Sequence, residues 1–540
     1  MKEEVGMKRR GPSRALVALA VAGLVACFGS TAQAQENIYE NETGLMGGSF
    51  VPAGGGALVQ SGFVIAGPRL NPNGIGQYLV GPYYDVRPIG TDAQHVNIQI
   101  INTNTNNTAL PVCTEADYAA GVDGAACYNP TGGILFKIRF RESKLSKEVL
   151  DFVVPLSCGE VWAGVVELGP NNLPRIRSKY PIATGASNAT QIVSDDILNT
   201  PNGQTFLPPN GVLPAGVTQE DVQRGYIEVI AMEALNCEPD DGELNIDEVE
   251  TWTRIAPPLD NTPSNALGAE AFLVRVGSGV SHAYNFVAIS AFVGAGLGSI
   301  APTNLFGDSV PDWDDCRALD GVLNPYADPF DCVRQVNLAL SKSRLVSQYD
   351  VNTLTSGSTD VIVTLPTKYA NCQLNPQGTN YASKRYPGTS FQCAPAGETI
   401  SCTVYNREEE FDSPETPPFS PGEPEQECLL PRELTIFHIS EAGGLGPLGD
   451  VGFATGNLDP SDSGWLDLDL VRDADGNIVH QEIFLNTITH DILGAYLAGY
   501  RGLPATGLVA QEFFNGNVGG TYGATVPSLA EQVVLKPGQS

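Results

Sequence analysis

The chain has 540 residues, of which 42% are apolar, and this is enough for two or three ordinary domains or one large domain with long loops. It carries 61 acidic and 30 basic residues, and the resulting formal net charge of -31 argues against binding to nucleic acid or anionic lipid. The 59 glycines and 39 prolines are typical of short strands joined by turns rather than of a helical protein.

The first 34 residues are predicted to be a signal peptide. A basic stretch at 8–14 precedes an apolar run that begins at Ala15 and is shorter than the about 20 residues a membrane-spanning helix needs. Two processing sites follow. The polar, small-residue segment before Ala34 favours cleavage after that residue, which would release a free extracellular, cell-surface or periplasmic protein. The alternative is a lipobox that ends at Cys27, whose acylation would tether the chain to a membrane.

Eight segments alternate apolar and polar residues with the period of two expected for half-buried strands. They are 95–100, 134–141, 148–154, 226–232, 270–276, 360–365, 401–406 and 434–439. In the second segment the residues predicted to face inward are Ile134, Phe136, Ile138 and Phe140, and those predicted to face outward are Lys137, Arg139 and Arg141. The pattern predicts a mainly β fold of antiparallel, immunoglobulin-like β-sandwich domains with long loops and few short helices.

Helix and turn signals are sparse. Thr218 and Asp221 have the spacing of a capping box and predict a short helix over 219–224. A second short helix is predicted over 488–500, and Asp475-Gly476 predicts a hairpin between the segments on either side of it.

A Pro-rich stretch at 255–265 is the best candidate for a domain boundary, and the alternative is that strands on either side of it cross into one sheet. The predicted organisation is a signal peptide over 1–34, an N-terminal β-sandwich region over 35–255 and a C-terminal β-sandwich region over 256–540. The C-terminal region contains two acidic loops, 308–332 and 407–428, and the second is predicted to be exposed because it is rich in proline and charge.

The chain has eleven cysteines, and ten remain once Cys27 is removed or acylated. An even number in an exported chain predicts disulfides, and the absence of a C-x-x-C motif argues against redox and zinc sites. The spacing favours Cys113–Cys127 and Cys316–Cys332 as local pairs and Cys158–Cys237 as a longer one. Three pairings stay open for the last four, which are Cys372, Cys393, Cys402 and Cys428.

Three segments, "GPYYDVRP", "KIRFRESKLSKEVLDFVVPLSCGEVWAG" and "STDVIVTLPTK", resemble parts of uncharacterised exported proteobacterial proteins that contain immunoglobulin-like sandwiches. The resemblance covers about half of the chain. It implies a β-sandwich fold and export, and it transfers no activity and no site residues.

The sequence contains no common catalytic signature. The five histidines are too scattered for a metal pair, and both the G-x-S-x-G elbow and the Walker A motif are missing. Calcium is the one metal ion that the sequence suggests, because carboxylates gather on a loop predicted to be closed by a disulfide. The candidate ligands there are Asp312, Asp314, Asp315 and Asp320. A weaker calcium candidate lies at 240–248, and the alternative for both is an acidic surface loop without a specific ion. Trp162 and Trp313 are the two candidates for stacking on sugar rings. Trp162, which lies in a strand, is assigned to the core, whereas Trp313 lies in the first acidic loop and stays open.

These observations favour a non-enzymatic function. The leading hypothesis is an exported, disulfide-bonded surface or extracellular protein that acts by assembly or adhesion, with envelope proteins, extracellular proteins, glycans or its own copies as partners. The main alternative is a secreted hydrolase of glycans or peptides that uses an unlocated carboxylate pair. A periplasmic binding module is less favoured because the alternating α/β pattern is missing.

Overall fold

The structure is a computed structural model. The residues that it describes are 69–104, 133–178, 203–207, 211–213, 216–235, 266–290, 336, 339–352, 357–367, 398–408, 411–412, 426–458, 461–472, 481–485, 497–515, 520–531 and 533–535. Most of these residues belong to strands, and the prediction of a mainly β, antiparallel sandwich fold is confirmed. That the sandwiches are immunoglobulin-like stays a prediction.

Two sheets form the N-terminal sandwich. Sheet A contains, in spatial order, β1 (Arg69–Leu70), β13 (Val287–Ser290), β3 (Tyr78–Asp85), β10 (Arg224–Leu235), β5 (Gly133–Glu142) and β6 (Glu148–Leu156). Sheet B contains β12 (Ser281–Asn285), β11 (Leu267–Arg275), β4 (Gln94–Asn102), β7 (Val161–Leu168), β8 (Pro174–Ser178) and β9 (Gln204–Thr205), with β2 (Ile75–Gly76) paired to β11. The apolar faces of the two sheets pack together, and Trp162 is fully buried among them, as predicted.

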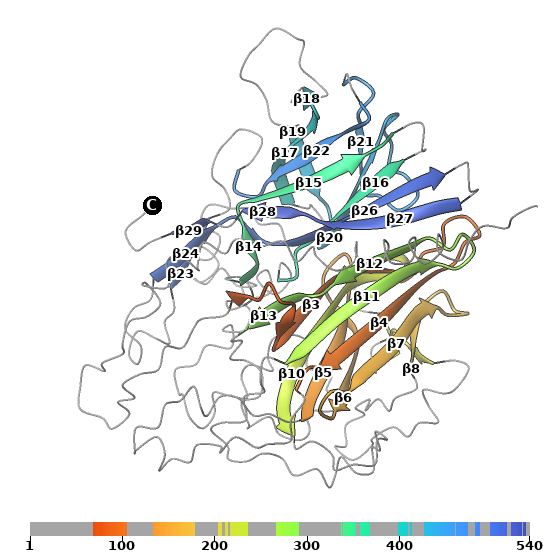
Figure 1. The fold of residues 1–540 in the computed structure, drawn as a ribbon, viewed down its shortest axis with the longest axis vertical. Coiled ribbons are helices and arrows are strands. Elements are labelled where there is room, and N and C mark those ends of the chain that lie inside the picture. Colours follow the sequence, from red (N-terminus) through yellow and green to blue (C-terminus); the bar gives the residue numbers. More distant parts are fainter. Residues whose placement is uncertain are drawn as a thin grey trace, which may run out of the picture.

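Two further sheets form the C-terminal sandwich. Sheet C contains β18 (Phe411–Asp412), β17 (Glu398–Asn406), β22 (Ser463–Asp469), β15 (Arg344–Asp350) and β28 (Leu529–Glu531), with β19 (Gln426–Leu430) paired to β17. Sheet D contains β21 (Val451–Ala454), β20 (Leu434–Ser440), β16 (Ser358–Thr364), β26 (Thr506–Asn515) and β27 (Gly520–Pro527). Every strand pair recorded in these four sheets is antiparallel except β20–β21. Figure 1 shows the two sandwiches as separate groups of strands.

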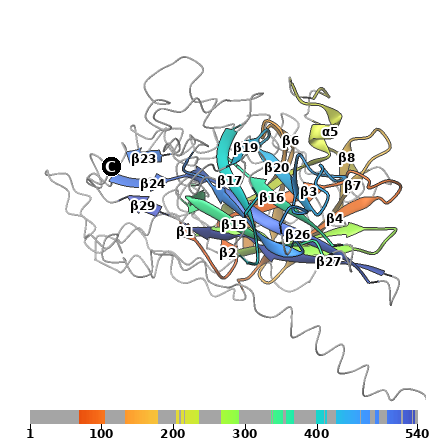
Figure 2. The ribbon, with the colours of Figure 1, turned by 90° about the horizontal axis from the view of Figure 1, so that it is seen from above.

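Two small sheets accompany the sandwiches. One pairs β14 (Ser341–Lys342) with β25 (Leu503–Pro504), and the other contains β23 (Gln481–Leu485), β24 (Leu497–Arg501) and β29 (Val533–Leu535). The three-stranded sheet lies to one side of the sandwiches in Figure 2.

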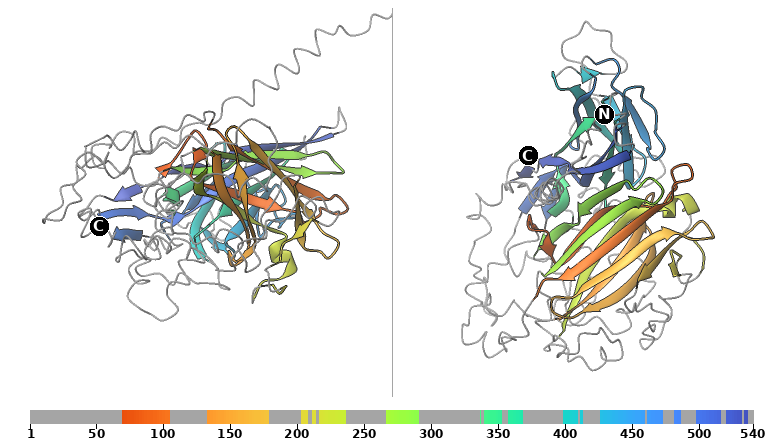
Figure 3. Two further views of the ribbon diagram at one scale, coloured as in Figure 1. Left: turned by 90° about the horizontal axis from the view of Figure 1, so that it is seen from below. Right: turned by 45° about the vertical axis from the view of Figure 1, so that its right-hand side comes forward.

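Sheet D is buried on both faces and joins the two sandwiches. One face, with Val361 and Phe437, packs against sheet C. The opposite face, with Ile362, Ile436 and Leu508, belongs to the same apolar cluster as the core of the N-terminal sandwich. Because both sandwiches share this sheet as a wall, they are packed directly against each other, as the right-hand view of Figure 3 also shows.

The sheets divide later in the chain than the predicted boundary at 255. Strands β11, β12 and β13 follow that position, yet β11 pairs with β4 and β13 pairs with β3. The Pro-rich stretch itself lies outside the described residues, as do most of the two acidic loops. Long-range strand pairing therefore carries the N-terminal sandwich on to Ser290, past the local turn signal.

The predicted hairpin at Asp475-Gly476 lies outside the described residues, and the described strands on either side of it, β22 and β23, belong to different sheets. Two other local predictions need correction. The described end of the predicted helix over 488–500 is strand β24, which is paired on both edges. Lys137, Arg139 and Arg141 do lie on the face opposite the core, but each is only 1% exposed, so this outward face is itself covered.

The capping box is confirmed. Helix α5 (Gln219–Val222) begins after Thr218, whose hydroxyl accepts a hydrogen bond from the backbone N–H of Asp221. The Asp221 carboxylate in turn accepts from the backbone N–H of Thr218 at 2.8 Å. The box satisfies donors that a helix of one turn would otherwise leave without partners.

The structure selects one pairing among the last four cysteines. Cys402 and Cys428 form a disulfide with a Cα–Cα distance of 5.7 Å, and both residues are buried in the C-terminal core. Cys158 is also disulfide-bonded. The pairings predicted for the remaining cysteines, and Cys27 itself, involve residues outside the described part of the chain.

Candidate functional site: a polar junction and an open groove

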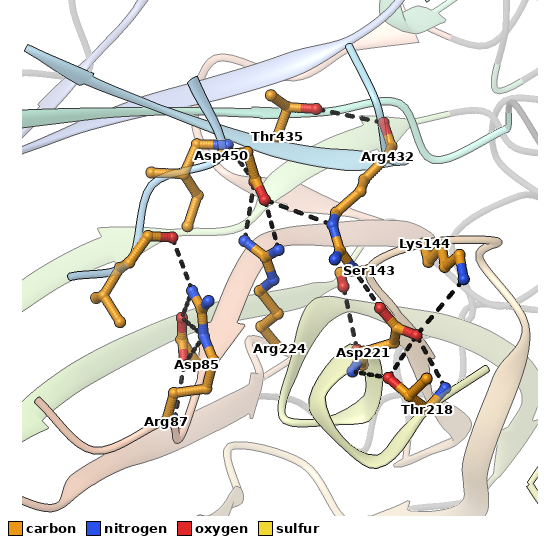
Figure 4. Close-up of polar contacts among 12 residues, drawn as sticks. Asp85, Arg87, Ser143, Lys144, Thr218, Asp221, Arg224, Arg432, Thr435 and Asp450 are labelled. Carbon is orange, nitrogen blue, oxygen red and sulfur yellow. Dashed lines mark hydrogen bonds and ion pairs between the residues drawn. The ribbon is translucent and has the colours of Figure 1, made fainter. Parts of the chain in front are cut away.

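A network of charged side chains, here called the junction, joins the two sandwiches (Figure 4). Its members are Asp85, Arg87, Asp221, Arg224, Arg432 and Asp450. The first four belong to the N-terminal sandwich and its short helix, and the last two flank β20 in the C-terminal sandwich. The junction therefore holds together segments that lie far apart in the sequence.

Asp450 is the centre of the junction. Its carboxylate accepts hydrogen bonds from the guanidinium group of Arg224 at 2.9 and 2.6 Å and from the backbone N–H of Ile436 at 3.0 Å. The Nε atom of Arg432 lies 3.4 Å from the same carboxylate. The side chains of Arg224 and Asp450 are only 2% and 9% exposed, so the pair is removed from water. A two-pronged ion pair of this kind fixes orientation as well as distance.

A glycine-rich loop, residues 441–450, brings Asp450 to this position. Gly446 has a positive φ of 60°, and a Cβ atom there would come within 2.6 Å of the His438 ring. The His438 Nδ1 atom lies 2.6 Å from Asp360 on the neighbouring strand. Leu448 of the same loop is buried, and its carbonyl accepts a hydrogen bond from Arg87 at 3.0 Å. Glycine is needed here because the loop lies directly on the histidine.

The second acidic centre of the junction is Asp221. Burial alone would raise the pKa of its carboxyl group, but hydrogen bonds from Thr218 and Arg432 outweigh burial and hold this pKa below its ordinary value. Arg432 therefore bridges Asp221 of one sandwich and Asp450 of the other. Each of these acidic groups is matched by a cation, an arrangement that fixes two surfaces against each other rather than one that activates a nucleophile.

A second set of polar contacts joins the sandwiches at the edge formed by β12 and β27. Glu512 of β26 forms ion pairs with Arg275 and His282 of the N-terminal sandwich. Burial would raise the pKa of Glu512, but these two partners outweigh it and lower that pKa. The His282 ring also lies 3.2 Å from the carbonyl oxygen of Ala524.

An open groove of about 580 Å³ lies between this edge and the outer face of sheet B. One wall comes from β26 and β27 and includes Leu508 and Pro527. The opposite wall includes Ile101 and Val161, both 38% exposed. The volume lies in the range of small-ligand sites, which are mostly apolar and contain a few well-placed polar groups.

Three polar residues cross the groove in one register row. Asn285 of β12 is opposite Glu270 of β11, and Glu270 is opposite Gln99 of β4. Side chains in such a row project from the same face of the sheet at intervals of about 5 Å. Among the described residues none of these three side chains has a hydrogen-bond or ion-pair partner, and Glu270 is the only charged side chain that lines the groove. The row therefore offers two carboxamides and one carboxylate to a ligand.

The structure leaves the calcium prediction untested. Asp312, Asp314, Asp315 and Asp320 lie outside the described residues, as does the weaker candidate at 240–248. Within the described residues, no three His, Cys, Asp or Glu side chains come together as metal ligands would. The three described histidines, His95, His282 and His438, each contact a carboxylate instead.

The sequence contained part of the signal for the groove. The alternation in 95–100 assigns Gln99 to the outward side of its strand, and the strand predicted over 270–276 includes Glu270. The alternation does not show that β4 and β11 are neighbours, that Asn285 completes the row, or that residues 506–527 form the opposite wall. These facts depend on strand pairing over large sequence separations.

Comparison with known proteins adds no assignment. No protein-family model matches the chain, and neither a curated protein nor a solved structure matches it. In the described part of the chain, no helix combines the length and the apolar character needed to cross a membrane.

Proposed function

We propose that this chain is an exported, disulfide-bonded adhesion or assembly protein that binds a neutral glycan in the groove between its two sandwiches. The observation that carries the proposal is the row formed by Gln99, Glu270 and Asn285 in a groove that apolar residues such as Ile101, Leu508 and Pro527 also line. Carboxamides and carboxylates can exchange hydrogen bonds with the hydroxyl groups of a sugar, and the apolar walls can contact its C–H faces.

Electrostatics favours a neutral ligand over an anionic one. No Lys, Arg or His is among the described residues that line the groove, and Glu270 gives the groove a negative charge. The net charge of -31 adds long-range repulsion of anions. Electrostatic repulsion would therefore make the binding free energy of an acidic polysaccharide or a phosphorylated ligand less favourable than that of a neutral one.

The rigid junction supports the same proposal. The groove has one wall from each sandwich, so its width depends on how the sandwiches are packed, and the buried Arg224–Asp450 pair fixes that packing. A groove that is already formed before binding loses less conformational entropy when the ligand enters.

Binding can be tested with the full chain on a panel of neutral and anionic oligosaccharides, followed by titration calorimetry. The double variant Gln99→Ala/Glu270→Ala should weaken the binding of a neutral glycan by roughly tenfold or more, because each lost hydrogen bond contributes about 0.5–1.5 kcal/mol. Asn97→Ala is the matched control, since Asn97 lies on the same face of β4 but outside the groove, and it should leave affinity unchanged.

Three outcomes would contradict the proposal. They are failure of the wild-type chain to bind any neutral glycan, a preference for anionic glycans, and equal losses in the control and double variants. Turnover of a bound glycan would instead support the alternative of a secreted hydrolase.

Export has its own test, which is the mass of the N-terminal peptide of the native protein together with cell fractionation. A peptide that starts at Gln35 in the medium or periplasm would support a free exported protein. A diacylated Cys27 in the membrane fraction would support a tethered one, and an intact N-terminus in the cytoplasm would refute export.

A further inference from the structure

The outer face of sheet A is a buried layer of charge. Lys137, Arg139 and Arg141 alternate along β5, and each is 1% exposed. The carboxyl groups of Asp151 and Glu148 on β6 and of Glu228 on β10 lie on the same face. Burying so many charged groups is unfavourable unless each one is well paired, so the quality of the individual contacts is informative.

Glu228 is fully paired. One of its carboxylate oxygens accepts a hydrogen bond from the hydroxyl group of Tyr78 at 2.5 Å, and the other accepts one from the guanidinium group of Arg141. This part of the face is an ordinary buried hydrogen-bonded ion pair.

Asp151 is held differently. Its Oδ2 atom lies 2.7 Å from the Nζ atom of Lys137, with the two side chains 8% and 1% exposed. The contact falls outside hydrogen-bonding angles, and this buried oxygen accepts no hydrogen bond. The Lys137 nitrogen is thus in contact with this carboxyl oxygen, but the contact lacks the directional geometry of a hydrogen bond.

A β-bulge brings a second carboxyl group to the same place. The register of β5 and β6 pairs Arg139 with Asp151 but skips Val149, so that Arg141 is opposite Glu148. Without the skipped residue, Glu148 and Asp151 would point to opposite faces of the strand, because side chains alternate. Glu148 is only 14% exposed, and its Oε2 atom lies 3.3 Å from Arg139 without accepting a hydrogen bond.

Glu148 is suited to carry a proton. Burial and the neighbouring Asp151 carboxylate raise its pKa to about 8, against the lowering effect of Arg139, Lys137 and Arg141. At neutral pH this carboxyl group therefore keeps its proton beside a carboxylate that is in contact with an amine.

We propose that Lys137 and Asp151 condense into an intramolecular amide bond that crosslinks β5 and β6, with Glu148 transferring protons. The ammonium group first gives a proton to the Asp151 carboxylate. The Nζ lone pair then attacks Cγ of Asp151 and forms the C–N bond. Glu148 donates its proton to the departing hydroxyl group and takes one from the nitrogen, so the C–O bond breaks and one water molecule leaves. No oxidant or other reactant is needed.

Two physical effects favour this reaction. The fold holds the reacting groups in contact, which replaces an encounter between separate molecules by an intramolecular step. The product also removes two opposite charges from a poorly hydrated layer and leaves a neutral amide, so the desolvation cost of the ion pair is relieved. The crosslink does not depend on what the groove binds.

Peptide mapping of the native full-length protein tests the proposal. After reduction and alkylation, trypsin should not cleave at Lys137. It should yield a branched peptide in which the fragment that ends at Arg139 is joined to the fragment that starts at Glu148. Intact mass should be lower by one water molecule than the mass of the uncrosslinked reduced chain. A wild-type protein at full mass, with separate linear peptides, would overturn the proposal without any variant.

Variants then assign the roles. Glu148→Gln should fold but stay at full mass, and Lys137→Arg should keep the charge without forming the bond. The matched control is Glu167→Gln, which alters a carboxylate paired with two arginines in sheet B and should keep the branched peptide. Circular dichroism confirms folding in each case. If folded Glu148→Gln forms the branched peptide as completely as the wild type does, Glu148 has no part in the reaction.

Discussion

Removing the Asp450 carboxylate should uncouple the two sandwiches. In Asp450→Ala the guanidinium group of Arg224, which is only 2% exposed, loses both of its hydrogen bonds to Asp450 and stays buried with its charge unpaired. Leaving one member of a buried ion pair unpaired costs about 3–5 kcal/mol. The backbone N–H of Ile436 also loses its acceptor. We therefore expect the free energy of unfolding to fall by roughly 3–5 kcal/mol.

The matched control is Asp467→Ala. Asp467 forms an ion pair with Arg344, whose side chain is 47% exposed, so the loss should be about 1 kcal/mol or less. Urea unfolding can be followed with single-tryptophan variants that keep Trp162, in the N-terminal sandwich, or Trp465, in the C-terminal sandwich. The two signals should coincide in the parent chain and separate in Asp450→Ala.

Two results would refute this reasoning. One is a loss for Asp450→Ala no larger than that for Asp467→Ala, which would mean that water reaches Arg224. The other is an unchanged, coincident transition, which would mean that the apolar contacts of sheet D alone hold the sandwiches together. Adding Arg224→Met to Asp450→Ala should recover part of the loss, because the unpaired charge is then removed as well.

Three further predictions concern stability. Burial lowers the pKa of Lys342 to about 7 from 10.5, so the folded state binds fewer protons than the unfolded state between these values and stability rises with pH there. Lys342→Met should therefore stabilise the protein by about 1–4 kcal/mol at pH 7 and below and by much less above pH 10.5; equal urea midpoints at pH 7 would contradict this. Burial raises the pKa of Glu142 from 4.5 to about 7, so its contribution to stability is lost as pH rises through this window. Glu142→Gln should flatten that part of the curve of unfolding free energy against pH, and an unchanged slope would refute the assignment. Opening the Cys402–Cys428 disulfide by Cys402→Ser should lower the unfolding free energy by about 2–5 kcal/mol, whereas a loss below 1 kcal/mol would show that the bond does not limit unfolding.

Local signals in the sequence determined the class of fold and several of its elements. The alternation in 95–100 places Val96, Ile98 and Ile100 in the core, and all three are fully buried in β4. The capping box at Thr218 forms as predicted. Such features depend on residues within one strand or one helical turn, so they can be read without knowledge of the fold.

Tertiary structure decided what lies next to each strand. Alternation shows that Lys137 faces away from the core, but only the covering of that face makes it 1% exposed and gives it Asp151 as a partner. Likewise β22 pairs with β15 and β17, and β23 pairs with β24, and none of these partners can be read from the local sequence of either strand.

The groove and the junction also depend on tertiary structure and cannot be predicted from local sequence. Each assembles residues that are distant in sequence, such as Arg224 and Asp450, whose partnership depends on how sheet D packs against the N-terminal sandwich. Periodicity fixes the face on which a side chain lies, whereas long-range strand pairing and sheet packing fix what that face meets.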